Sequence, residues 1–338
     1  MDLLVTFLGT SASVPTRARG TAATLIARGG ERWLVDCGEG TQRQLLRSGL
    51  GLVDIDVILL THLHGDHILG LPGLVKTYGL RGRERPLRVV GPRGVGELVD
   101  RLGVIIGRTP YPLLIEEATA ETVHESDGVV IESFHTDHSV SSLGYAMIED
   151  HRPGAFDVAA ATSLGVPPGP LFGRLQRGDT VTLEDGTAVR PDQVLGPERS
   201  GRSLVISGDT RPCESTAAAA DGADLLVHEA TFLHAELDRA LETRHSTARE
   251  AAELGRAAGV RLLALTHLSS RFMPRDARAE AEAVFPDVIV PRDFDQVEVP
   301  FRERGEPRLI RGGEDGATRG RVDDPASGDD LPASPVTS

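Results

Sequence analysis

The sequence is poor in cysteine and lysine, and it contains no long apolar run. Its two cysteines, Cys37 and Cys213, are too few for the disulfide framework of a small secreted protein. No apolar stretch approaches the roughly 18 residues that a membrane-spanning helix needs. The opening MDLLVTFLGT also lacks the basic start of a signal peptide. These absences exclude a disulfide scaffold and an integral membrane protein, and we expect a soluble, cytoplasmic protein without membrane contact.

The charge balance is acidic, with a formal net charge of −14. Such a charge argues against general binding of nucleic acid. The basic residues are nearly all arginine, a bias that a GC-rich genome is sufficient to explain. Between Pro72 and Arg93, however, six basic residues accompany a single acidic residue, Glu84: Lys76, Arg81, Arg83, Arg85, Arg88 and Arg93. We therefore expect one basic face on an acidic protein.

What the sequence does contain is a regular alternation of short apolar strands and Gly-rich turns. This rhythm runs from Leu3 to about Ile148 and includes a hairpin closed by Gly29-Gly30. With 338 residues, 40% of them hydrophobic, the chain can form a large core. Helices are expected at residues 93–103 and within 240–258, so the fold class is layered α/β (α+β).

The second helical stretch contains its own start signal. Thr247 and Glu250 have the spacing of a capping box, in which the two side chains satisfy backbone donors of the first turn. The cap predicts that His245 stands just before a helix N-terminus.

Two segments lack the alternation of short apolar strands and Gly-rich turns. Residues 150–200 are rich in Pro and Gly, and their last part, TVTLEDGTAVRPDQV, predicts a small hairpin. We interpret them as an insertion that projects from the main body. From Gly312 the chain has almost no large apolar side chains, which is typical of a disordered acidic tail. The expected boundaries are 1–311 for one catalytic domain, with about 150–197 as its insertion, and 312–338 for the tail.

The densest cluster of ligand-type residues is THLHGDH, at positions 61–67. In an extended backbone His62 and His64 point to one face, and the glycine that follows permits a turn that brings Asp66 and His67 back. Imidazole nitrogens suit Zn²⁺. One loop rarely aims four side chains at one ion, so we expect two ions.

Ligand-type residues also follow four separate apolar strands, which end in His62, Asp209, His228-Glu229 and His267. Because ligand sites in layered α/β sheets lie at strand ends, four such residues predict one shared site. Asp209 is the natural carboxylate to bridge two ions. The segment HTDHSVSSLGY offers one more ligand, from either His135 or His138.

This arrangement, THLHGDH followed by distant His, Asp and His residues, resembles the metallo-β-lactamase superfamily. The resemblance implies an αββα sandwich with a dinuclear site at one edge. Further motifs resemble the tRNase Z family of endonucleases, which mature tRNA 3′ ends: FLGTSASVPTRARG, VDCGEGTQRQLL, HSVSSLGY, SGDTRPCE, HEATF, HST and THLSSRF. They occur in matching order over about residues 1–300.

The resemblance implies two Zn²⁺ ions per subunit, with Mn²⁺ as an alternative. One zinc would be held by His62, His64, His138 and Asp209. The second would be held by Asp66, His67, Asp209 and His267.

The resemblance also implies an inserted flexible arm whose Gly/Pro motif grips tRNA. GVPPGPLFGRLQRG, at 165–178, resembles that motif, although by itself it would indicate only a surface loop. Substrate contacts are expected on the arm at Gly169, Pro170, Arg174 and Arg177, and beside the site at Ser270 and Arg271. The family commonly works as a homodimer, in which the arm of one subunit presents tRNA to the other subunit's site.

The expected chemistry is hydrolysis of a phosphodiester. Two neighbouring cations can produce hydroxide near pH 7 and stabilise charge on phosphate oxygens, and Asp66 could both bind metal and orient the hydroxide. The leaving oxygen needs a proton, for which His245 and Glu229 are the candidates. The helix N-terminus favours neutral His245, and a nearby carboxylate would offset this effect and orient the ring.

We therefore expect an endoribonuclease that cuts precursor tRNA after the discriminator base, leaving a 3′-hydroxyl on the tRNA and a 5′-phosphate on the trailer. The alternative is a dinuclear hydrolase of small phosphodiesters or thioesters, because the same metal motif serves those reactions. A catalytically silent RNA-binding scaffold is the third possibility.

Overall fold

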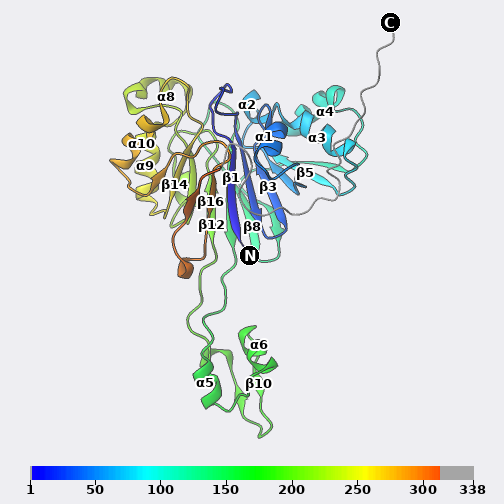
Figure 1. Cartoon of the computed structure of the whole chain (residues 1–338), viewed down its shortest axis with the longest axis vertical. Coiled ribbons are helices and arrows are strands. Elements are labelled where there is room, and N and C mark those ends of the chain that lie inside the picture. The colour runs from blue at the N-terminus through cyan, green and yellow to red at the C-terminus, as the bar shows by residue number, and fades with distance from the viewer. Residues whose placement is uncertain (1, 313–338) are drawn as a thin grey trace.

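The structure, a computed structural model, describes residues 2–312. Within them two mixed β-sheets lie face to face (Figure 1). The first contains, in spatial order, β17 (Arg308–Ile310), β16 (Gln296–Glu298), β1 (Leu3–Gly9), β2 (Ala23–Arg28), β3 (Glu31–Val35), β4 (Val57–Leu59), β5 (Leu87–Gly91) and β6 (Leu113–Glu117). The second contains β15 (Val288–Ile289), β14 (Leu263–Thr266), β13 (Leu225–Glu229), β12 (Ser203–Ile206), β9 (Leu143–Glu149), β8 (Val129–His135) and β7 (Thr122–Ser126).

Alternation along the strands explains why the sheets are covered on both faces. In β1, Val5 and Phe7 pack between the two sheets, whereas Leu8 packs under the helices. The outer face of the first sheet is covered by α1 (Thr41–Arg47), α3 (Leu71–Leu80) and α4 (Val95–Ile106). The outer face of the second is covered by α7 (Glu214–Ala219), α9 (Ala248–Ala257) and α10 (Pro274–Glu282). Three apolar layers result, and the predicted αββα sandwich is confirmed.

The remaining short elements of the body lie at its two ends. They are α2 (Gly65–Ile68), η2 (His234–Glu236), α8 (Leu237–Thr243) and η3 (Arg302–Arg304). Figure 1 places α2 and α8 at the upper end of the sandwich, and the chain's first strand starts at the lower end. No helix within residues 2–312 is long and apolar enough to cross a membrane.

The two predicted helices agree with the helices of the structure to different degrees. Residues 93–103 correspond to α4, which starts two residues later and ends three residues later. The helix predicted within 240–258 is present as α9 (Ala248–Ala257), and the preceding residues form a separate short helix, α8, which ends at Arg244, where φ is +56°. The capping box of Thr247 with Glu250 is present and begins α9. His245 thus lies in a break between two helices.

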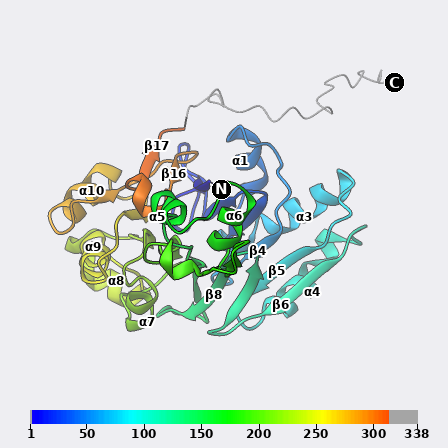
Figure 2. The same cartoon turned by 90° about the horizontal axis from the view of Figure 1, so that it is seen from below.

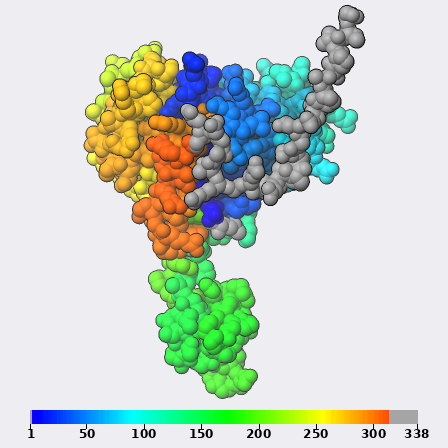
Figure 3. Space-filling model, viewed as in Figure 1, coloured from blue at the N-terminus to red at the C-terminus, as the bar shows by residue number. Residues whose placement is uncertain are grey.

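Residues 150–200 project from the lower end of the sandwich as an arm (Figures 1 and 3). The arm contains α5 (Val158–Ser163), α6 (Pro170–Gln176), β10 (Val181–Thr182), β11 (Ala188–Val189) and η1 (Pro191–Gln193). Its apolar side chains form a core of their own: Ala161, Val166, Leu175, Val181, Val189 and Val194. The view along the arm in Figure 2 shows α5 and α6 in front of the sandwich.

Two predictions within this part of the sequence can be compared with the structure. The small hairpin in TVTLEDGTAVRPDQV is present as β10 and β11. The second half of the Gly/Pro motif is the helix α6 rather than a loop: Gly169 adopts a φ of +146° before the helix, and Pro170 occupies its first turn. The expected acidic tail lies outside the described residues from position 313 onward.

The expected basic face is wrong for Arg83, which is buried, and the charges of Arg85 and Arg88 are paired with carboxylates. Arg83 is only 7% exposed and donates to backbone carbonyls beneath it. Arg88 pairs with Glu116 at 2.6 Å, and Arg85 pairs with an aspartate of the body. The spacing along the chain showed the positive charges but not these partners: Arg83 bonds to the carbonyls of Ile55 and Pro86, and the carboxylates belong to Asp56 and Glu116.

A buried carboxylate ties the two sheets together at the end from which the arm leaves. Glu149, the last residue of β9, accepts two hydrogen bonds of 2.6 Å from Arg202 and one of 2.8 Å from Arg28 of the first sheet. Burial alone would raise the pKa of Glu149, but the hydrogen bonds from both arginines outweigh it and lower that pKa below its usual value.

Replacing Glu149 with glutamine should lower the free energy of unfolding by about 3 kcal/mol, because it leaves buried Arg202 without a counter-charge and Arg28 with Glu31 alone. The carboxylate stabilises the fold fully above its pKa in the unfolded chain, and this contribution is lost as the pH falls through its lower folded pKa. Urea unfolding from pH 7 to pH 3 measures the effect. The gap between wild type and variant should narrow with acid, and a constant gap would contradict this account.

Candidate metal centre

The site begins where β4 ends, in the loop 61–67. Asp36, which follows β3, accepts the backbone N–H of Thr61 at 2.8 Å, and its other oxygen lies 2.8 Å from His67 Nδ1. The helix α2 then starts at Gly65 and turns Asp66 and His67 back toward the strand end. The loop is therefore fixed at both ends by one buried carboxylate, as expected of a support behind a metal ligand.

A first group of ring nitrogens converges on one point. His62 Nε2 and His138 Nε2 lie 3.0 and 3.4 Å from His64 Nδ1. His138 reaches this point because its Nδ1 is held 2.9 Å from the carbonyl of Arg244, in the break between α8 and α9. His135 is exposed at the end of β8. Of the two alternatives in HTDHSVSSLGY, only His138 reaches the site.

A second group lies beside the first. Asp66 Oδ2 is 3.5 Å from His67 Nε2 and 3.3 Å from His267 Nε2. His267 directly follows β14, and its φ of +54° turns the side chain into the site. The backbone N–H of Ser13 donates to Asp66 at 2.9 Å and limits the positions that this carboxylate can take.

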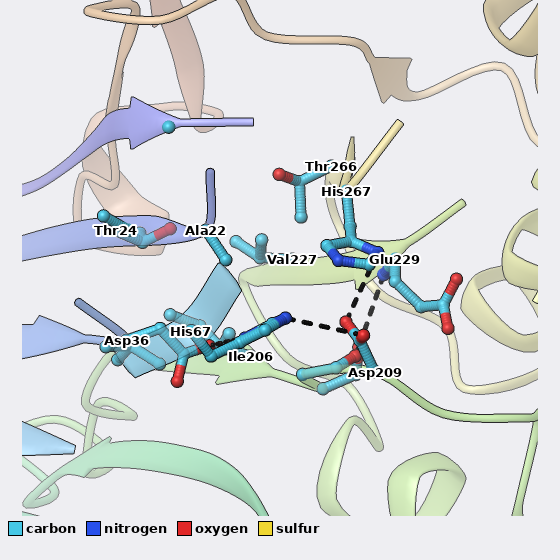
Figure 4. Close-up of a pocket in the computed structure, with 15 residues that line it drawn as sticks. Ala22, Thr24, Asp36, His67, Ile206, Asp209, Val227, Glu229, Thr266 and His267 are labelled. Carbon is cyan, nitrogen blue, oxygen red and sulfur yellow. Dashed lines mark hydrogen bonds and ion pairs between the residues drawn. The ribbon is translucent and has the colours of Figure 1, made fainter. Parts of the chain in front are cut away.

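Asp209 lies between the two groups, and His67 and His267 approach it from two sides in Figure 4. Its Oδ2 is 3.7 Å from His62 Nε2 and 3.5 Å from His67 Nε2, and its Oδ1 is 3.4 Å from His267 Nδ1. The preceding Gly208 has a φ of +62°, and a Cβ there would lie 2.8 Å from the Cβ of Thr61. Only glycine allows the two ligand loops to approach this closely.

These side chains fit a divalent metal ion. Their ligand atoms fall into groups whose members lie within 4.8 Å of one another, among them His62/His64/His138 and Asp66/His67/His267. His67 Nε2 is buried and makes no hydrogen bond, and carboxylate oxygens of Asp66 and Asp209 lie 3.5 Å from it, so an ion held by these carboxylates would be within reach of this nitrogen. Burial and the neighbouring His67 lower the pKa of His62 well below its usual value, which favours the neutral, metal-binding form.

A second pair of titratable groups lies against this centre. His245 Nδ1 is 2.8 Å from Glu229 Oε1, and the rings of His245 and His267 stack at 5.6 Å. Burial would lower the pKa of His245, but the Glu229 carboxylate outweighs it and raises that pKa to about 9. Glu229 therefore raises the pKa of His245, as predicted, but the effect that it offsets here is burial rather than the helix N-terminus. His228, on the opposite face of β13, does not reach the site, although it belongs to the same strand end.

Three residues at the site were missed in the sequence. Asp36 follows an apolar strand, as the recognised ligands do, so the strand-end rule could have found it. Thr231 donates to Glu229 at 2.7 Å and lies 2.9 Å from His267 Nδ1. Arg211 donates to the carbonyl of His245 at 2.6 Å. Thr231 lies in the HEATF segment and Arg211 in SGDTRPCE, but their contacts with His267 and His245 join segments far apart in the chain.

The predicted substrate contacts fall into two places. Ser270 and Arg271 are exposed in the loop after His267, and Arg271 packs over the ring of Phe232 at 4.7 Å. The contacts predicted on the arm are exposed and lie at the other end of the molecule from α2 (Figure 1): Gly169, Pro170, Arg174 and Arg177. Within one chain the structure does not bring the two sets together.

Comparison with known proteins identifies the family. Residues 16–158 match the metallo-beta-lactamase superfamily. The chain is 48% identical to the ribonuclease Z of Natronomonas pharaonis, over 89% of this chain and 99% of that protein. It is 47% identical to the ribonuclease Z of Gemmatimonas aurantiaca, over 90% of this chain and 98% of that protein. The chain belongs to the ribonuclease Z family. The resemblance inferred from the motifs is thereby confirmed.

Solved structures agree with this assignment. The human tRNase Z, short form, is 27% identical and superposes with a TM-score of 0.65, covering 88% of this chain and 99% of that one. YhfI from Bacillus subtilis, at 20% identity and a TM-score of 0.64, shares the fold. Family and fold thus both agree with the metallo-β-lactamase sandwich described above.

Proposed function

We propose that this protein is an endoribonuclease that removes 3′ trailers from precursor tRNA. It hydrolyses the phosphodiester after the discriminator base and leaves a 3′-hydroxyl on the tRNA and a 5′-phosphate on the trailer. The observation that carries the proposal is the 48% identity to a ribonuclease Z over 89% of the chain. Because its substrate is precursor tRNA, we assign the protein to the cytoplasm.

Two Zn²⁺ ions per subunit, or Mn²⁺ in their place, would be held by the two groups that share Asp209. His62, His64 and His138 would hold one ion, and Asp66, His67 and His267 the other. When bound, such ions lower the pKa of water and stabilise negative charge on phosphate oxygens. Asp36 and Thr231 keep the rings of His67 and His267 turned toward the centre.

Asp66 is the residue that orients the attacking water. Its Oδ2 faces the rings of His67 and His267 and accepts the N–H of Ser13. Among the described residues, Oδ1 has no hydrogen-bond donor. This oxygen can accept a hydrogen bond from a water that attacks the phosphorus.

His245 supplies the proton to the leaving 3′ oxygen. Glu229 holds its Nδ1 at 2.8 Å, and Arg211 holds its backbone carbonyl. Within the described part of the chain Nε2 has no hydrogen-bond partner, so it is available to the substrate. Glu229 in turn receives hydrogen bonds from Thr210 and Thr231 and therefore stays in place while the proton moves.

The direction of the arm supports action as a homodimer. β9 starts at Leu143, close to His138, and reaches the arm after seven residues, at Glu149. A seven-residue strand spans about 20 Å, and the arm then continues away from α2 (Figure 1). An arm that leaves its own site in this way can present tRNA to the site of a second subunit.

Incubation of the purified protein with 3′-extended precursor tRNA, with and without a chelator, tests the function. Mapping of the product end should locate the cut after the discriminator base, and chelator should abolish the cut until Zn²⁺ or Mn²⁺ is added back. Metal analysis should find about two zinc ions per chain. Absence of a cut near the discriminator base would overturn the proposal. Hydrolysis of small phosphodiesters alone would favour the small-substrate alternative, and binding of RNA with no metal and no activity would favour a silent scaffold.

A further inference from the structure

The two chain segments that connect the arm to the body form a paired stalk. Arg152 and Arg199 exchange backbone hydrogen bonds of 2.7 and 2.9 Å, and Gly196 donates to the carbonyl of Ala155 at 2.9 Å. The segments approach so closely that a Cβ on Gly154 would lie 1.9 Å from the carbonyl oxygen of Gly196. The stalk therefore leaves the body as one narrow ribbon, visible as the neck in Figure 3.

An aromatic ring of the body is inserted at the base of this ribbon. The guanidinium carbon of Arg152, on the stalk, lies 3.4 Å from the ring centroid of Phe301. The guanidinium carbon of Arg202, which is 2% exposed beneath the stalk, lies 4.2 Å from the same ring. Phe301 thus contacts one arginine from the stalk and one from the core, an arrangement that cation–π attraction stabilises.

A carboxylate of the adjoining turn η3 binds both stalk segments. Glu303 accepts from Arg152 through both oxygens, at 2.9 and 3.0 Å, and lies 3.3 Å from Arg199. The hydrogen bond from Arg152 is the main cause that lowers the pKa of Glu303 to about 2. A bidentate pair restricts direction as well as distance, so Glu303 limits rotation of the stalk.

We infer that Phe301 and Glu303 are positioning residues for the tRNA substrate, because together they fix the direction in which the arm leaves the body. This inference rests on the proposed function. The arm's core is separate from the cores of the sandwich, so contacts at the base of the stalk set its orientation. A small rotation at the base is multiplied along the arm, and it displaces bound tRNA relative to the active site.

The variant Glu303→Gln tests the inference, with Glu298→Gln as a matched control. Glu298 lies nearby on β16, pairs with Arg308 at 2.5 Å and makes no bond to the stalk, and the substitution changes the charge equally. Hydrogen exchange of residues 150–156 and 195–200 reports stalk order without any substrate. Kinetics with precursor tRNA and with bis-p-nitrophenyl phosphate separate positioning from chemistry. Phe301→Leu is the second variant, in which packing is removed but no charge is changed.

For Glu303→Gln and Phe301→Leu we expect faster exchange in the stalk and a loss of about 10-fold in kcat/KM for precursor tRNA, mainly through KM. Turnover of the small diester and the values for Glu298→Gln should match wild type. Unchanged exchange, or faster exchange with unchanged KM for tRNA, overturns the inference. An equal loss on both substrates overturns it as well, because it indicates damage to the site. Failure of wild type itself to cut precursor tRNA overturns the proposed function and the inference with it.

Discussion

His245→Ala is expected to lower kcat for precursor tRNA by about 10²- to 10⁴-fold, which is the usual effect of removing a general acid. Metal content should stay at the wild-type value, because the ring is held by Glu229 rather than by the two groups that share Asp209. The fold should tolerate the change, since Thr247 and Glu250 cap α9 independently of this ring. Single-turnover cleavage, together with metal analysis of the same sample, measures both quantities.

His135→Ala is the matched control, because this histidine is exposed near the site and its ring contacts no ligand group. It should cleave at the wild-type rate. Turnover of His245→Ala at the wild-type rate would remove His245 from catalysis. A joint loss of metal and rate would instead make His245 a ligand, an alternative that its place near His138 and Asp209 keeps geometrically possible.

The sequence predicted which of these side chains lie together because they follow one rule. His62, Asp209, Glu229 and His267 each lie at or just beyond the end of an apolar strand, and the strands of a sandwich bring their ends to a common edge. That rule gives the position of a residue along its strand but not the face of the sheet to which its side chain points. It therefore also named His228, which belongs to the same strand end but faces the other side of the sheet.

What the sequence could not predict depends on contacts between distant segments. The capping box predicted where α9 begins, but not that a separate helix, α8, ends at Arg244, where the carbonyl lies 2.9 Å from His138 Nδ1. Arg83 stands among exposed positive charges in the sequence, yet its carbonyl partners bury it. In both cases the outcome depends on tertiary partners, and a single sequence contains no sign of those partners.

Deletion of the arm is the other change with a large expected effect, and the structure shows where the arm can be removed without disturbing the body. Ala155 and Gly196 already pair, so residues 156–195 can be replaced by a two-residue Gly-containing turn that preserves the stalk base. The arm's core contributes nothing to the three layers of the sandwich, so the armless protein should fold. Cleavage of precursor tRNA should fall by more than about 10²-fold, since the positioning of a large substrate is lost. Hydrolysis of bis-p-nitrophenyl phosphate should continue at the wild-type rate, and an equal loss of both activities in a folded protein would contradict a tRNA-gripping arm.

Mixed dimers of the armless protein with the His245→Ala variant test whether each arm presents tRNA to the active site of its own chain or to that of the partner subunit. Each of the two proteins should be nearly inactive on precursor tRNA by itself, because the first lacks the arm and the second lacks the proton donor. The arm leaves the end of the sandwich opposite its own metal centre, so the intact arm of the His245→Ala subunit should serve the intact site of its armless partner. Co-expression with two affinity tags isolates the mixed dimer, and its cleavage rate should recover to about half that of wild type, because one of two sites is served. A mixed dimer that forms but stays inactive would show that each arm serves the site of its own chain. In that case the arm would have to bend back along the sandwich, and the contacts of Phe301 and Glu303 with Arg152 at the base of the stalk would have to break.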